Sequence, residues 1–197
     1  CNLIIAHHPL IFGGINSIST DSANGRLLTK LIKNDIALYA CHTQLDMTDE
    51  FGNLEIAKCI GATNPVKLEG AELGVVFDLD KKDTVKNYAK KVAEALDASG
   101  VVTLNSPDDM VSRVYVQGGA FDEDNIPAIL DGRVDLVISG EIKHHLCVLL
   151  DEYGVSTLIV GHNASERVYL PEFKNVLDEH FGSVNIFVNF GKERNFN

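Results

Sequence analysis

The chain has 197 residues, of which 45% are hydrophobic and 23% are charged, and its formal net charge is −11 at pH 7. This composition is typical of a globular protein with a real core, and the negative charge disfavours binding to nucleic acid or to an anionic membrane surface. No signal peptide is visible in the sequence, and no apolar run reaches the roughly 18 residues that a membrane helix needs. Its four cysteines form no CxxC pair, which indicates reduced thiols and a cytoplasmic protein.

The first part of the chain predicts strands and helices in alternation. Residues 2–6 are wholly apolar after Asn2, as in a strand buried on both faces. Residues 24–34 place leucines at helical spacing, residues 35–42 form a second apolar run, and residues 52–61 predict a helix that stops at a glycine. This β-α-β-α order indicates an α/β layer fold.

A turn-rich stretch, residues 64–70, then indicates a boundary between two lobes. We expect a helix near residues 83–98 with Asp83 as its N-cap, and a helix over residues 164–181 that is interrupted or bent near Pro171. The other expected elements are strands at 71–80, 100–105, 111–120, 134–141, 155–162 and 184–190, and helices at 124–131 and 142–153.

Histidines and carboxylates follow the ends of several predicted strands. His7 and His8 end the first strand, Asp46 comes shortly after the second, and His162 and Glu166 follow a later one. In open α/β sheets, ligands bind at the edge formed by the carboxyl ends of the strands. Imidazole and carboxylate together suit zinc, iron or manganese, and a helix that begins near residue 162 would place His162 and Glu166 on one face. This set suits two divalent metal ions with positions left open for water or substrate.

Other readings of the same residues stay open at this stage. The paired histidines alone fit a structural role about as well as a metal role. Glu141 follows a strand too, and a carboxylate there would also be favoured by a helix N-terminus. Gly118 and Gly119 suit either a phosphate cradle at a helix start or a tight turn. For His180, near a helix end, we expect a structural role.

Four short motifs then suggest a family. "HHPLIF", "HTQLD", "SGEIKHH" and "GHNASE" occur in this order, and together they resemble the hallmark motifs of the NIF-three-like family. Members of that family are also known as dinuclear metal centre proteins or as homologues of a type 2 class of GTP cyclohydrolase I. The resemblance covers residues 3 to about 190.

The resemblance implies two α/β lobes with a dinuclear metal site in the cleft between them. We expect residues 1–64 with 155–197 to form the lobe that holds the metal ligands, and residues 65–154 to form the other. The implied ligands are His7, His8, Asp46, His162 and Glu166. The resemblance also implies that an N-terminal part of the family fold is missing here, and that the protein forms ring-shaped homohexamers.

Two kinds of function follow from these expectations. The first is a metal-dependent hydrolase of a small molecule or nucleotide, with Glu141 or His145 as the proton-transfer group and His144 lining the same cleft. GTP ring opening is one activity that the resemblance suggests. The alternative is a metal-binding chaperone or regulatory protein without enzymatic activity, which would act through protein contacts and not through DNA.

Overall fold

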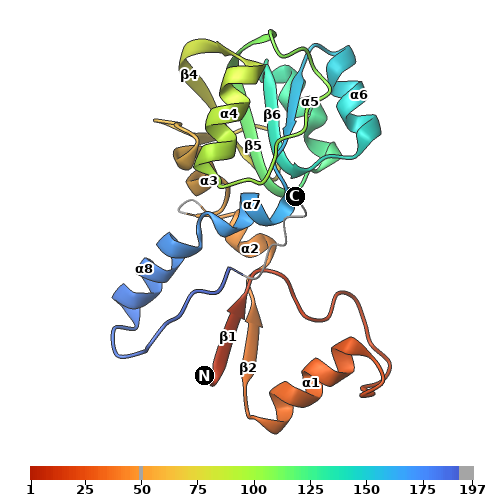
Figure 1. The fold of residues 1–197 in the computed structure, drawn as a ribbon, viewed down its shortest axis with the longest axis vertical. Helices are drawn as coiled ribbons and strands as arrows, with labels where there is room; N and C mark the ends of the chain where they lie inside the picture. The colour runs from red at the N-terminus through yellow and green to blue at the C-terminus, as the bar shows by residue number, and fades with distance from the viewer. Residues whose placement is uncertain (49–50, 191–197) are drawn as a thin grey trace. The chain divides into compact units, whose positions relative to one another are not determined.

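The computed structural model describes residues 1–48 and 51–190, and it confirms an α/β protein (Figure 1). The chain divides into two compact units, Cys1–Asp46 and Met47–Asn197. Each unit contains its own sheet and its own helices.

The first unit is built on two parallel strands joined by a helix. Strands β1 (Leu3–Ala6) and β2 (Ala37–Ala40) pair in register from Leu3 with Ala37 to Ala6 with Ala40. Helix α1 (Ala23–Lys33) connects them, and the Ser22 hydroxyl caps it by accepting a hydrogen bond from the amide of Gly25. The short helix α2 (Thr43–Asp46) follows β2. The ends of β1 and β2 therefore lie next to each other, because the strands are parallel.

The second unit contains a sheet of five strands in the order β3-β4-β5-β6-β7. The strands span Val66–Lys67, Val75–Thr84, Met110–Ala120, Leu136–Glu141 and Ser156–Ile159. β3, β4 and β5 are antiparallel, whereas β5, β6 and β7 are parallel. The parallel half places the carboxyl ends of β6 and β7 at one edge, as expected for consecutive strands joined by a helix.

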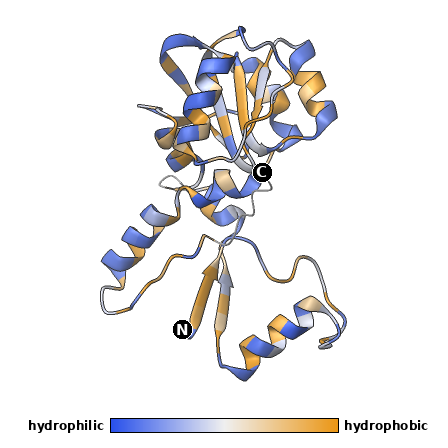
Figure 2. Cartoon of the chain, viewed as in Figure 1, coloured by the Kyte–Doolittle hydropathy of each residue, from blue (hydrophilic) through white to orange (hydrophobic). Residues whose placement is uncertain are grey.

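Both faces of the central strands of this sheet are buried. Val76, Tyr115 and Val137 lie in register on one face and belong to the main hydrophobic cluster, together with Ile129 and Leu150. The next register, Phe77 with Val114 and Leu136, faces the other side and is at most 3% exposed. Figure 2 shows the hydrophobic character of the central strands. Such runs are typical of strands covered on both sides.

The helices of the second unit are α3 (Asn53–Cys59), α4 (Val85–Ala95), α5 (Ile126–Asp131), α6 (His144–Glu152), α7 (His162–Arg167) and α8 (Leu170–His180), with a 3-10 turn η1 (Glu123–Asn125). Helix α7 contacts β5 and β6, whereas α6 contacts β7 (Figure 1). The helix predicted over residues 164–181 is interrupted just before Pro171, as one of the two expected outcomes, and forms α7 and α8. Pro171 lies in the first turn of the second one, where its missing N–H costs nothing.

Three other predictions about local structure are wrong. Thr84, and not Asp83, caps α4, because its hydroxyl accepts from the amide of Asn87. Residues 100–105 are all described and form no strand. Within this range only Val102 forms a β-bridge, with Ile159, and the side-chain oxygen of Asn105 then accepts a hydrogen bond from the amide of Thr157. Residues 184–190 are also described and form no strand, because an apolar run does not by itself supply a neighbouring strand to pair with.

The two compact units divide the chain differently from the predicted lobes. We expected residues 1–64 with 155–197 in one lobe and 65–154 in the other. The boundary between the two compact units falls, along the chain, between Asp46 and Met47. The difference arises because β7 pairs with β6 in one sheet. The lobes inferred from the family resemblance stay a prediction.

Candidate functional site

Three histidines gather at the carboxyl end of the two-stranded sheet in the first unit. His7 and His8 follow β1 and His42 follows β2, and the amide of His42 donates to the carbonyl of His7 at 2.8 Å. The ring centroids of His7 and His8 are 4.7 Å apart, and that of His42 lies 5.8 Å from each. Parallel pairing therefore brings three imidazoles from two chain segments into one cluster.

Asp46 adds a carboxylate to this cluster. The Nε2 atom of His7 lies 3.1 Å from the Oδ2 atom of Asp46, and the two side chains are only 11% and 14% exposed. Asp46 reaches His7 because α2 turns the chain back directly after β2. Of the predicted metal ligands, the structure thus brings His7, His8 and Asp46 together within the first unit.

His42 was not among the predicted metal ligands. Its φ angle is +44°, in the left-handed region that residues other than glycine seldom adopt. Backbone strain of this kind persists where surrounding structure demands it, often at functional sites. The sequence held a signal for it, because His42 directly follows the second apolar run, as His7 follows the first.

Cys41, which precedes His42, has the character of a core thiol. Its side chain is buried, and burial raises the pKa of the thiol above its ordinary value. A raised pKa leaves less thiolate at neutral pH, and the thiolate is the reactive form. The imidazole and carboxylate groups, and not this thiol, therefore carry the chemistry of the cluster.

In the second unit, His162 lies between two carboxylates. Helix α7 begins at His162, so His162 and Glu166 share one face, and the Nε2 atom of His162 lies 3.0 Å from the Oε1 atom of Glu166. On the other side of the ring, Nδ1 lies 3.1 Å from the Oε1 atom of Glu141, at the end of β6. The start of α7 at His162 thus places His162 and Glu166 on one helix face, as expected, and Glu141 joins the same group.

This arrangement has an electrostatic consequence. A neutral imidazole has one N–H, so it can donate to only one of the two carboxylates. If Nδ1 donates to Glu141, the lone pair of Nε2 faces the Oε1 atom of Glu166. Two lone pairs at hydrogen-bond distance repel each other unless a cation lies near both. A positive ion bound by His162 and Glu166 would remove this repulsion.

The predicted proton-transfer residue His145 lies elsewhere in the second unit. It belongs to the first turn of α6, its side chain is 69% exposed, and its Nε2 atom lies 3.9 Å from the Oε2 atom of Glu123. His144 begins the same helix and is also exposed. The structure thus pairs Glu141 with His162, and His145 with Glu123.

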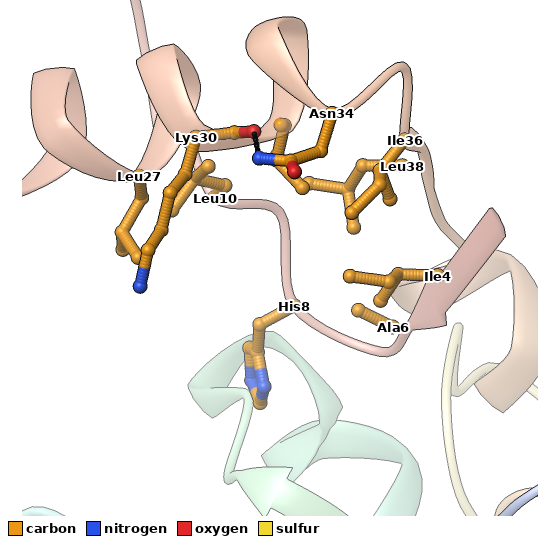
Figure 3. A pocket seen from close by; sticks show the side chains of 10 residues that line it. Ile4, Ala6, His8, Leu10, Leu27, Lys30, Asn34, Ile36 and Leu38 are labelled. Carbon is orange, nitrogen blue, oxygen red and sulfur yellow. Dashed lines mark hydrogen bonds between the residues drawn. The ribbon is translucent and has the colours of Figure 1, made fainter. Parts of the chain in front are cut away.

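The first unit also contains a cavity of about 560 Å³ between its helix and its strands (Figure 3). Its walls are aliphatic side chains of β1, α1, β2 and the loops that follow them. The polar side chains that line it are His8, Lys30 and Asn34, and the Asn34 amide donates to the carbonyl of Lys30 at 2.8 Å. A candidate metal ligand, His8, is therefore also a wall residue of an apolar cavity.

The molecule is an α/β protein in which imidazole and carboxylate groups follow the ends of several strands. Comparison with known proteins identifies its family. The sequence model of the Duf34/NIF3 family (NGG1p interacting factor 3) matches residues 1–194. The chain belongs to this family. No helix within residues 1–48 and 51–190 is long and apolar enough to cross a membrane.

Individual relatives agree with this assignment. The chain is 26% identical to a GTP cyclohydrolase 1 type 2 homolog of Clostridium acetobutylicum over 84% of its own length and 64% of that protein's. It is 30% identical to a protein of the same name from Pyrococcus horikoshii, over 95% and 75% of the two lengths. The fold is also similar to that of a NIF3-related protein of Bacillus cereus, with a TM-score of 0.85, 21% identity, and coverage of 92% of this chain and 78% of that one. The chain thus spans about two thirds of the length of the first of these relatives.

Proposed function

We propose that this protein binds two divalent metal ions through His7, His8, Asp46, His162 and Glu166, and that it is a metal-dependent hydrolase of a small molecule or nucleotide. The observation that carries the proposal is the placement of His162 between Glu141 and Glu166. Histidines that bind metals usually donate their other ring N–H to a carboxylate. Glu141 fits that partner, which leaves Nε2 and the Glu166 carboxylate as donors to a cation.

The donor set of the first unit fits the same group. His7, His8 and Asp46 offer imidazole nitrogens and a carboxylate, which zinc, iron and manganese all accept. Bound divalent ions would polarise a substrate and activate water for hydrolysis. His42, against the rings of His7 and His8, would restrict their orientation.

The chain's own residues suggest how the reaction would be supported. Glu141 holds the tautomer of His162, and its side chain is 63% exposed, so it can exchange a proton with solvent. His145 contacts Glu123 and has no such link to His162 in the structure described, so the geometry favours Glu141 for proton transfer. A small molecule in the apolar cavity of the first unit would lie against His8. The relatives' names make GTP one substrate to test.

A second candidate function is metal binding without catalysis, as part of a regulatory or chaperone protein. The family's description as an interacting factor favours it. So does the exposure of Leu3, Ile4 and Ile5 on β1, since large exposed apolar side chains that cluster often mark protein contacts. In either case we propose a cytoplasmic homo-oligomer, with six copies as the family resemblance implies, and an acidic surface that does not bind nucleic acid.

Elemental analysis of the purified protein, followed by a hydrolysis screen over nucleotides, phosphoesters and cyclic amides, tests these functions. We expect about two divalent ions per chain, and a turnover that is lost in His8→Ala and Glu166→Ala but kept in His180→Ala. His180 is a fair control because it is an exposed histidine at the end of α8. Metal binding without turnover of any compound would support the second function, and the absence of bound metal would contradict both.

A further inference from the structure

We infer that Gly119 is a positioning residue, which fixes the carboxylate of Glu166 against the imidazole of His162. This inference rests on the proposed metal role of His162 and Glu166. It concerns the glycine pair at the end of β5, for which the sequence left a phosphate cradle and a tight turn as alternatives. All of the residues involved belong to the second unit.

Gly119 is the residue that leaves space for the Glu166 carboxylate. Its φ angle is +65°, in the left-handed region that glycine adopts without strain. A Cβ atom at this position would lie 2.5 Å from the Oε1 atom of Glu166 and 3.4 Å from the Nε2 atom of His162. The same carboxylate oxygen and ring nitrogen form the contact that we assign to the metal. Any other residue would therefore displace the Glu166 carboxylate oxygen, while the His162 nitrogen would lie at van der Waals distance from the added atom.

Buried hydrogen bonds hold Gly119 in place. Its amide donates to the Ser165 hydroxyl at 3.0 Å, and its carbonyl accepts from the Ser139 hydroxyl at 3.1 Å. The Ser165 hydroxyl in turn donates to the carbonyl of His162 at 2.8 Å. Ser139 and Ser165 are 0% and 1% exposed, so these bonds are shielded from water. Ser165 thus links Gly119 directly to the first turn of α7, the helix that carries both His162 and Glu166.

The close approach of α7 to the sheet depends on a second glycine. A Cβ atom on Gly140, in β6, would lie 2.6 Å from the Ser165 hydroxyl and 2.8 Å from the Cα atom of His162. The backbone of α7 therefore rests directly on the ends of β5 and β6, in agreement with its contacts to both strands (Figure 1). This contact fixes the height of the donors above the sheet edge.

The hydrogen bonds of Gly118 and Gly119 also exclude a phosphate cradle at this glycine pair. The amide of Gly118 donates to the Asn53 side chain at 2.7 Å, and the amide of Gly119 donates to Ser165. A phosphate cradle needs backbone amides that point toward the ligand, and both amides of this pair are used within the fold. The glycines are therefore needed for close packing and not for anion binding.

Titration of the metal-free protein with Co²⁺ tests the inference, because the visible absorption of bound Co²⁺ reports on its ligands. We expect Gly119→Ala to weaken Co²⁺ binding roughly 10–100-fold, as substitutions beside metal ligands do, and to change the absorption band. Gly154→Ala is the matched control. Gly154 also has a positive φ angle, +76°, but nothing lies within 4 Å of its added Cβ atom, so this variant carries the backbone strain alone and should bind Co²⁺ like wild type.

A second variant tests the mechanism. Glu166→Asp has a side chain shorter by one methylene, which withdraws the carboxylate from Gly119. The loss of affinity caused by Gly119→Ala should therefore be smaller in the Glu166→Asp background than in wild type. An equal loss in both backgrounds would overturn the inference, because the effect would not then pass through the Glu166 carboxylate.

The remaining outcomes separate this inference from the proposed function. If wild type binds no Co²⁺ and no other divalent ion, the proposed function fails, and the inference fails with it. If wild type binds Co²⁺ and Gly119→Ala binds it equally well with the same band, only the inference fails. Should Gly119→Ala not fold, Ser165→Ala removes the tie between Gly119 and His162, and unchanged Co²⁺ binding there would overturn the inference as well.

Discussion

The Nδ1 atom of His162 lies 3.1 Å from the Oε1 atom of Glu141, although the two residues come from different elements, β6 and α7. A charged acceptor at Nδ1 favours the tautomer that keeps Nε2 free of a proton. Glu141→Gln keeps an oxygen that can accept the hydrogen bond but removes the charge. We expect this variant to bind Zn²⁺ about tenfold more weakly, as measured by calorimetry. Glu152→Gln, on the exposed side of α6, is the control and should bind as wild type does.

The paired histidines of the first unit are expected to matter for metal content before they matter for folding. His8 is exposed, so His8→Ala should change the free energy of unfolding by no more than about 0.5 kcal/mol. His7→Ala removes the partner of Asp46 as well, and should cost more. Both variants should lose bound metal in elemental analysis, while circular dichroism stays unchanged. Normal metal content in both would contradict the proposed ligand set.

Two buried tyrosines predict a loss of stability in alkali. Burial raises the pKa of both Tyr88 and Tyr115 above the ordinary phenol value of 10.0. A group whose pKa is raised on folding stabilises the folded state fully below its unfolded pKa, and this contribution is lost as the pH rises toward the folded value. The free energy of unfolding in urea should therefore fall as the pH rises above about 10.

Tyr88→Phe isolates one of these two contributions. The Tyr88 hydroxyl donates to the carbonyl of Ile60 at 3.0 Å, so the variant should be less stable at neutral pH by about 1–3 kcal/mol. Above pH 10 the difference between the two proteins should shrink, since the variant has one fewer buried phenol to ionise. A difference that stays constant across this pH range would show that Tyr88 does not contribute to the alkaline loss.

The cap of α4 gives a test of the fold itself. Thr84→Ala removes the hydroxyl that accepts from the amide of Asn87, and should cost about 1 kcal/mol of unfolding free energy. Asp83→Ala loses mainly an ion pair with Lys91, whose side chain is 66% exposed, and such pairs contribute less. Urea unfolding of both variants should therefore rank Thr84→Ala as the more destabilised. The opposite order would indicate that Asp83 is the functional cap.

Much of the fold could be predicted from the sequence because its signals are local. Apolar runs and helical spacing located most of the strands and helices. The failures at residues 100–105 and 184–190 have a different origin, since pairing depends on which strand edges are available. The side chain of Asn105, and not a backbone carbonyl, accepts the hydrogen bond from the amide of Thr157. No local sequence pattern indicates such a contact.

The contacts of the candidate site are likewise of two kinds: some follow from local sequence, and others depend on the pairing of distant segments. The placement of His162 and Glu166 on one helix face follows from helical spacing and was expected for a helix that begins near residue 162. The contacts between Glu141 and His162, and between Gly119 and Glu166, join segments that meet only through the sheet. The role of His42 was missed because its position depends on the pairing of β1 with β2, and its left-handed backbone cannot be read from the residue type.

The thin core of the first unit has a consequence for hydrogen exchange. Within Cys1–Asp46 the buried residues are Gly25, Cys41 and Leu45, whereas the central strands of the second unit are almost fully buried. Amide protons of β1 and β2 should therefore exchange through local opening at a lower free energy than those of β5 and β6. Each opening would disperse the cluster of His7, His8 and His42, so an ion bound there would slow exchange in β1 and β2 in proportion to its concentration. Part of its binding free energy would then be consumed in ordering the strands that carry its ligands.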